Sequence, residues 1–197
     1  MPIFNFYFSI FNENFKFKIS NLGMNFILFN LVIILVVIIL FVVLSWVWPP
    51  NSPWAPWWRT NRKTARAICK LAGISKKDIV YDLGSGDGTF LITAAKEFDV
   101  KGMGIEIEPT RYFISKIRII LNNLSPKVMI KRKNFFDENL SEATVVVVYL
   151  VPKTLDLLLP KFEKELRKGT RIVSYKYQLN LKSQISNLKN NLFLYRI

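Results

Sequence analysis

The chain has 197 residues, a length typical of one domain with a short additional segment, and its 28 Lys and Arg against 14 Asp and Glu give a net charge of +14. It contains no His, which excludes His-ligated zinc and His-based triads, and its single cysteine, Cys69, excludes an internal disulfide or a multi-Cys metal site. We therefore expect no bound metal. Because 51% of the residues are hydrophobic, we expect a folded domain and not a disordered basic tail.

A long uncharged segment near the N-terminus predicts a transmembrane helix. No charged residue lies between Lys18 and Arg59, and 26–48 consists almost entirely of Phe, Ile, Leu and Val. At about 1.5 Å of rise per residue, this segment is long enough to cross a hydrocarbon core of about 30 Å. A signal peptide would have a shorter apolar stretch and small residues before its cleavage point. We therefore divide the chain into an N-terminal tail (1–25), a transmembrane helix (26–48), a Trp/Pro-rich juxtamembrane linker (49–61) and a folded domain (62–197).

The charges on the two sides of this segment predict its orientation. The N-terminal side carries only Glu13, Lys16 and Lys18, whereas seven Lys and Arg residues lie between 59 and 77. The positive-inside rule then predicts a single-pass protein with its C-terminal domain in the cytoplasm. A basic face on the helix expected at 62–72 would meet either an anionic lipid surface or water. All five tryptophans lie in 46–58, where they suit an interfacial belt or packing against the domain.

Beyond residue 78, apolar runs alternate between the patterns of strands and helices. Strands are predicted at 79–83, 102–107, 128–131, 144–150, 171–177 and 192–197. Helices are predicted at 62–72, 89–98 and 109–124 and around 155–166, where we expect Pro160 to break or kink the helix. Such alternation with short joints predicts an α/β fold with a doubly wound parallel sheet.

The loop after the first of these strands contains a glycine motif. Residues 81–88 read Tyr-Asp-Leu-Gly-Ser-Gly-Asp-Gly, and the glycines permit a tight turn with a ligand against bare backbone. Glu106 ends the next strand, where a carboxylate can accept hydrogen bonds from two ribose hydroxyls. A glycine loop and an acid in this arrangement predict a cofactor that contains a nucleoside.

The charges of the loop favour S-adenosylmethionine (SAM) over a phosphorylated cofactor. Asp82 and Asp87 would repel a pyrophosphate but attract the sulfonium and ammonium groups of SAM. Thr89 occupies the position where a dinucleotide fingerprint has Gly or Ala, and the Gly-Lys-[Ser/Thr] of a P-loop is missing. The residues themselves therefore predict a SAM site.

Several stretches also resemble a known family. Residues 80–88 resemble motif I of class I SAM-dependent methyltransferases, which implies their Rossmann-like fold. The stretches 104–106, 134–137, 149–152 and 169–174 resemble a narrower family of membrane-anchored protein-lysine methyltransferases. In mitochondria its members modify the ATP synthase c subunit and the adenine nucleotide translocase, and it has prokaryotic relatives. One departure is 54–58, Trp-Ala-Pro-Trp-Trp, where relatives carry a Val-Pro-Thr-Pro-like segment.

The resemblance also implies roles for individual residues. Gly84 and Gly86 would contact the methionine part of SAM, the acids of the loop its ammonium side, Glu106 the ribose, and Asn134 the adenine edge. The complete set expected to bind the cofactor is Asp82, Gly84, Ser85, Gly86, Asp87, Glu106 and Asn134. Tyr149, at the tip of the fourth strand, would line the site of the methyl acceptor.

These observations lead to one main hypothesis and several alternatives. The main one is a membrane-anchored methyltransferase acting on a lysine amine of a membrane-associated protein. Methyl transfer mainly requires alignment and the exclusion of water, and an apolar slot lowers the pKa of a lysine, so the lack of His is no objection. A lipid, a quinone or an RNA remains an alternative acceptor, although no RNA-binding module is evident. A non-catalytic SAM-binding membrane scaffold is the third alternative.

Overall fold

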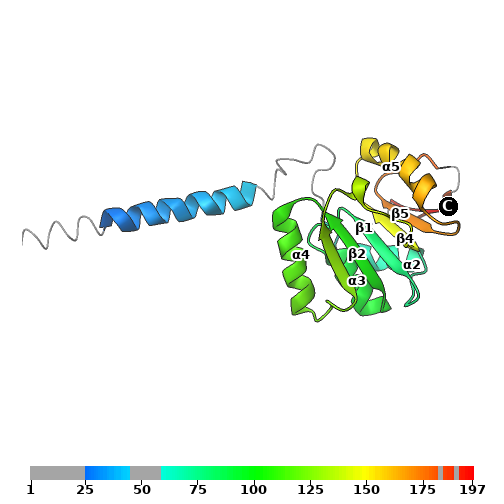
Figure 1. The fold of residues 1–197 in the computed structure, drawn as a ribbon, viewed down its shortest axis with the longest axis horizontal. Helices are drawn as coiled ribbons and strands as arrows, with labels where there is room; N and C mark the ends of the chain where they lie inside the picture. Colours follow the sequence, from blue (N-terminus) through cyan, green and yellow to red (C-terminus); the bar gives the residue numbers. More distant parts are fainter. Residues whose placement is uncertain (1–24, 45–58, 182–183, 189–190) are drawn as a thin grey trace, which may run out of the picture. The chain divides into compact units, whose positions relative to one another are not determined.

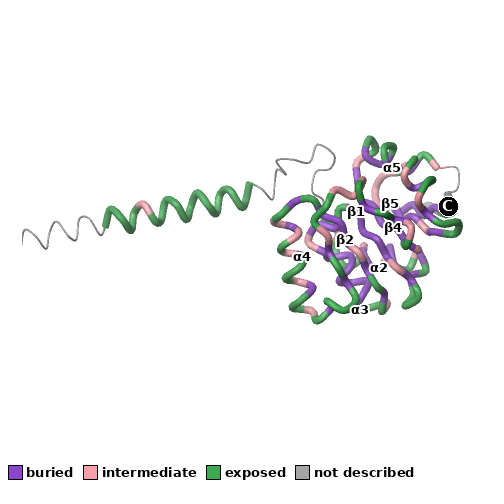
Figure 2. Tube along the Cα trace, in the orientation of Figure 1, coloured by how far each residue is buried: buried purple, intermediate pink, exposed green. Residues whose placement is uncertain are grey.

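The computed structural model describes residues 25–44, 59–181, 184–188 and 191–197. The chain separates into two units, 1–45 and 46–197. In the first, a helix spans Asn25–Leu44 with a mean hydropathy of 3.6, and Figure 2 colours almost all of it as exposed. Its one polar interior side chain, Asn30, donates from Nδ2 to the Phe26 carbonyl at 2.7 Å. The helix is long and apolar enough to cross a membrane. Residues 45–58, with all five tryptophans, lie outside the described residues.

The second unit is built on a seven-stranded sheet with the order β3-β2-β1-β4-β5-β7-β6 (Figure 1). The strands are β1 (Ile79–Leu83), β2 (Lys101–Glu106), β3 (Val128–Arg132), β4 (Val145–Val148), β5 (Arg171–Tyr175), β6 (Gln184–Leu188) and β7 (Leu192–Arg196). The first five strands pair in parallel, whereas β7 is antiparallel to both β5 and β6.

The strands β6 and β7 add an antiparallel edge to the parallel sheet that the sequence predicts. Only a few residues join β6 to β7, and such a short link permits a hairpin but not a parallel crossover. Strand β6 lies between the strands predicted at 171–177 and 192–197 and was not predicted from the sequence. Because β6 lies at the edge of the sheet, it does not require the continuous apolar run that marks a central strand such as β4.

Helices cover both faces of the sheet, as the doubly wound prediction requires. They are α2 (Arg62–Leu71), α3 (Thr89–Phe98), α4 (Pro109–Leu121) and α5 (Pro152–Glu165), with a 3₁₀ turn, η1 (Phe135–Asp137). Buried residues of α2, α3 and α4 share one apolar cluster with Val80 and Val145, and α5 shares a second cluster with Tyr81 and Val146. Consecutive residues of one strand thus point to opposite faces, each packed against its own layer of helices.

Side-chain caps explain where α2 and α4 begin, and exposure to water explains how α5 contains a proline. The Asn61 side chain accepts a hydrogen bond from the Thr64 amide at 2.8 Å and so caps α2. Glu108 caps α4 in the same way, with Pro109 in the first turn. Pro160 does not break α5, one of the two outcomes expected from the sequence, because the helix runs through it from Pro152 to Glu165. Pro160 and Asp156 are both exposed, so the carbonyl that loses its helical partner faces water.

Candidate active site

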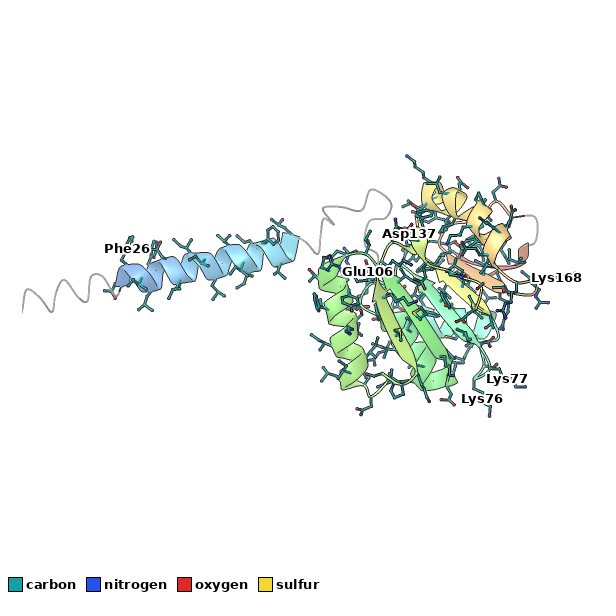
Figure 3. All side chains as sticks on the ribbon, viewed as in Figure 1. Phe26, Lys76, Lys77, Glu106, Asp137 and Lys168 are labelled. Carbon is teal, nitrogen blue, oxygen red and sulfur yellow. The ribbon has the colours of Figure 1, made fainter. Side chains whose placement is uncertain are left out.

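A cleft of about 890 Å³, counting the part open to solvent, lies at the carboxyl ends of β1, β2, β4 and β5. Figure 3 shows Glu106 at this end of the sheet and Lys76 and Lys77, which precede β1, at the opposite end. Parallel α/β sheets bind their ligands at the carboxyl ends of the strands, beside the point where strand order reverses. Here β1 is followed by β2 on one side and β4 on the other, so the cleft occupies that position.

The glycine loop after β1 forms the floor of the cleft. Gly84, Gly86 and Gly88 have φ values of +82°, +54° and +74°, a region that side chains with a Cβ rarely adopt. The amides of Gly84 and Ser85 both donate to the Ile105 carbonyl, at 2.9 and 3.1 Å. The loop is therefore held against the end of β2, which brings Glu106 next to it.

Glu106 connects this loop to the start of α4. Its side chain is 5% exposed; Oε2 accepts from the Gly86 amide at 2.8 Å and Oε1 from the Glu108 amide at 2.9 Å. Burial raises the pKa of Glu106, against the opposing effect of these two amides. Each carboxylate oxygen can accept a second hydrogen bond. The side chain is thus rigidly oriented and still able to accept from two ribose hydroxyls.

The two aspartates of the loop have different surroundings. Asp82 is 7% exposed, and burial together with the nearby Glu106 and Asp87 raises its pKa to about 8. Asp87 forms ion pairs with Arg59 at 2.9 Å and with Arg118 at 2.6 Å, and it accepts from the Thr89 amide at 3.1 Å. The negative charge of Asp87 is therefore already compensated, whereas Asp82 has a buried carboxyl group next to another carboxylate.

Ser85 fills the space between the loop and β2. Its Oγ is buried without a hydrogen-bond partner among the described residues. A Cβ placed on Gly104 would lie 2.7 Å from this Oγ, so the close approach of loop and strand requires glycine at that position. A buried hydroxyl in a ligand cleft with spare capacity to donate and accept is suited to a bound polar molecule.

The other end of the cleft is aromatic. Tyr149 follows β4, Tyr175 ends β5, and their ring centroids are 4.4 Å apart. Phe135, in η1, also lines the cleft. Burial, with smaller effects from Tyr175 and Tyr177, raises the pKa of Tyr149, so its hydroxyl stays protonated at neutral pH. This part of the cleft can exclude water from a group that enters it.

The cleft brings together all but one of the residues predicted from the sequence. Asn134 is not among its lining residues; its Oδ1 accepts from the Phe136 amide at 3.1 Å and caps η1, so that the next residue, Phe135, reaches the cleft. Sequence reasoning missed several lining residues: Arg59, Thr60, Glu108, Arg111, Phe135 and Tyr175. Glu108 carried a signal, because an acid before Pro109 marks a helix start. The others come from segments far apart in the chain.

These groups fit SAM. The pocket lining has four carboxyl groups, on Asp82, Asp87, Glu106 and Glu108, against the two guanidinium groups of Arg59 and Arg111, and this excess of acids favours a ligand with positive charge and hydroxyls over a polyphosphate. The left-handed glycine loop allows the ligand to approach the backbone closely, and the aromatic end is suited to an apolar or amine-bearing acceptor. The arrangement can therefore place a sulfonium methyl group between the acids and the tyrosines.

Comparison with known proteins supports this assignment. The family model of the ANTKMT methyltransferase domain matches residues 82–184. A protein-lysine N-methyltransferase of Saccharolobus islandicus is 39% identical over 156 residues, 75% of this chain and 95% of that protein. The adenine nucleotide translocase lysine N-methyltransferase of Mus musculus is 33% identical over 118 residues, 60% of this chain and 51% of that protein.

A solved structure also confirms the fold and the cofactor. An RNA methyltransferase of Salinibacter ruber, crystallised with S-adenosyl-L-homocysteine, matches with a TM-score of 0.67 and 28% identity. The match covers 71% of this chain and 94% of that one. The Rossmann-like methyltransferase fold, the family resemblance and SAM as cofactor, all expected from the sequence, are thereby confirmed.

Proposed function

Because the chain belongs to the ANTKMT methyltransferase family, we propose that it methylates a lysine amine of a membrane-associated protein with SAM as the methyl donor. The observation that carries the proposal is the composition of the cleft, which has carboxyl groups at one end and tyrosines at the other. The Saccharolobus islandicus relative, 39% identical, bears the name of a protein-lysine methyltransferase and supports the same acceptor.

The residues of the cleft have separate tasks in this reaction. SAM supplies an electrophilic methyl group on a sulfonium, and the lone pair of the amine forms the new C–N bond as the C–S bond breaks. Glu106 and the glycine loop hold the donor in place, while Tyr149 and Tyr175 surround the incoming amine. A lysine in a desolvated aromatic slot has a lowered pKa, so it can lose its proton to water before it attacks. Alignment and desolvation account for the catalysis without a histidine base.

The N-terminal segment would hold the enzyme on a membrane. The helix Asn25–Leu44 has the length and hydropathy of a single span, and the predicted span 26–48 continues into residues outside the described part. Seven basic residues lie between 59 and 77, against three charged residues before the span. By the positive-inside rule, the catalytic domain then lies in the cytoplasm. The basic residues after the span suit an anionic lipid surface.

A test of the acceptor is methyl transfer from labelled SAM to membranes of cells that lack the protein. Protein, lipid and RNA fractions are counted separately, because the net charge of +14 and the Salinibacter ruber RNA methyltransferase make RNA the main competing acceptor. We expect label in the protein fraction, recovered as methyl-lysine after hydrolysis. The Glu106→Ala variant should abolish it, and Asp137→Ala, at an exposed residue outside the cleft, should not.

Each other outcome contradicts the proposal in a distinct way. Label in RNA or lipid would assign a different acceptor to the same cleft. SAM binding without transfer to any fraction would favour a scaffold that binds the cofactor without catalysis.

A further inference from the structure

The outward side of α4 is apolar. Phe113, Ile117, Ile120 and Leu121 recur at helical spacing and are 58%, 56%, 58% and 76% exposed. The opposite side of the helix carries its buried residues, Arg111, Ser115 and Ile119, and packs on β2 and β3. A surface helix normally turns polar residues to water, so the exposed apolar side of α4 indicates a further apolar contact. We call these four exposed residues the α4 ridge.

The segment around the ridge is strongly basic. From Pro109 to Phe136 the chain carries seven Lys or Arg residues and no Asp or Glu. Five of these seven cations have acidic partners, in the pairs Arg111–Glu108, Arg118–Asp87, Lys127–Asp99, Lys131–Glu138 and Lys133–Glu138. Lys116 and Arg132 are exposed and form no ion pair among the described residues. An apolar ridge with basic surroundings complements a surface that is apolar beneath an anionic layer.

We propose that the α4 ridge rests on an anionic lipid bilayer, with its four apolar side chains among the headgroups and acyl chains. An amphipathic helix with basic flanks binds membranes in this way. A symmetric contact between two copies through the ridge would bring the Lys116 side chains of both copies, which form no ion pair among the described residues, toward one another, and this like-charge contact disfavours self-association. The inference rests on the proposed membrane attachment, but not on the identity of the methyl acceptor.

This contact would orient the active site. Ile107, Glu108 and Arg111, which immediately precede or begin α4, all line the cleft. A ridge lying on the bilayer therefore places the cleft opening beside the lipid headgroups. Lysines at the surface of a membrane protein lie at that level, so the ridge would select acceptors by their height above the bilayer.

The test reads lipid contact directly, with the full-length protein in nanodiscs. A single cysteine is introduced as Ile117→Cys or Leu121→Cys and labelled with a fluorophore. The native Cys69 is fully buried, and burial raises the pKa of its thiol to about 12, so it reacts slowly. The matched control is Leu157→Cys, an apolar position that is 48% exposed on α5, which covers the other face of the sheet. Quenching by brominated phospholipid is measured in discs of phosphatidylglycerol and of phosphatidylcholine.

We expect the ridge labels to be quenched at least about twofold more than the label at position 157, and more strongly with phosphatidylglycerol. Equal quenching at all positions, or none at the ridge, would overturn the inference while leaving membrane attachment intact. Ridge labels that are shielded from water but not quenched, together with disulfides between copies when the unlabelled Leu121→Cys variant is treated with a mild oxidant, would assign the ridge to self-association instead. Failure of the protein to co-float with lipid vesicles before the labelling would contradict the proposed attachment and this inference with it.

Discussion

At the scale of single residues, the carboxyl groups of the cleft decide which ligand it can hold. Asp87 is neutralised by Arg59 and Arg118 and fixes the start of α3 through the Thr89 amide. Asp82 is buried beside Glu106, and its pKa is raised to about 8. A cation bound nearby stabilises the ionised form of Asp82, so ligand binding and proton release are linked at this residue.

This linkage leads to a prediction for Asp82→Asn. In the unliganded protein near pH 7, Asp82 is mostly protonated, so SAM binding should release a proton, and SAM affinity should rise as the pH increases toward about 8. The substitution should remove the pH dependence and weaken binding above that pH by roughly ten- to hundredfold, the value of a charge-assisted contact of about 1.5–3 kcal/mol. Calorimetry in two buffers of different ionisation enthalpy measures both effects.

The stability of the unliganded protein should change in the opposite direction. The pKa of Asp82 in the folded state lies above the ordinary aspartate value of about 3.9. Its contribution to the free energy of unfolding is therefore fully present below pH about 4 and is lost as the pH rises through about 8. Asp82→Asn should keep its thermal midpoint at high pH better than the wild type does. The control, Asp137→Asn, should behave as wild type, and the same pH dependence in both variants would refute this assignment.

At the scale of secondary-structure elements, β2 determines how closely the glycine loop approaches the sheet. Gly102 and Gly104 lie in the same strand and point to the same face of the sheet. A Cβ on Gly104 would lie 2.4 Å from Ile130 Cδ1 and 2.7 Å from Ser85 Oγ, whereas on Gly102 its nearest neighbour would be Leu91 Cδ2, at 2.8 Å. Gly104 therefore lets Ser85 and the loop approach the strand, whereas Gly102 only leaves room for the packing of Leu91.

Substitution of these glycines by alanine should distinguish the two roles. Gly104→Ala should destabilise the fold by about 1–3 kcal/mol through overpacking and, by displacing Ser85, should also weaken SAM binding. Gly102→Ala contacts the flexible end of Leu91 and should cost less stability without changing SAM affinity. Denaturant unfolding and calorimetry measure the two effects. Unchanged SAM affinity in a folded Gly104→Ala variant would show that Ser85 and the loop tolerate the shift.

At the scale of the whole molecule, charge and hydropathy are distributed very unevenly along the chain. An uncharged segment from residue 19 to 58 separates a nearly neutral tail from a strongly basic domain. This asymmetry is the physical basis of the proposed orientation, because cationic flanks are retained on the cytoplasmic side of a membrane.

A cysteine appended after Ile197 tests this orientation. In intact cells, a membrane-impermeant maleimide should not label it, and labelling should appear once the membrane is permeabilised. As the control, a cysteine placed instead before the predicted span should already be labelled in intact cells. Ready labelling of the C-terminal cysteine in intact cells would refute a cytoplasmic catalytic domain.

The features that could be predicted from the sequence are mostly local ones. The glycine loop, the acid at the end of β2 and the boundaries of β1 and α3 follow from backbone conformation, capping and hydrophobic period, which act over a few residues. The choice of SAM likewise came from charges within one short loop. The long apolar segment before residue 59 could also be predicted from the sequence, because length and hydropathy alone define it.

The remaining features could not be predicted in this way, because they depend on contacts between segments that are distant in the chain. Arg59, Phe135 and Tyr175 line one cleft only because the sheet brings the ends of separate elements together, and Asn134 lies outside it because it caps η1. The polar strand β6 forms only because β7 offers it an edge to pair with. The sequence pattern of the apolar residues of α4 is the same whether they are buried in a core or exposed at the surface. Packing against β2 and β3 buries one side of that helix and leaves the ridge outside.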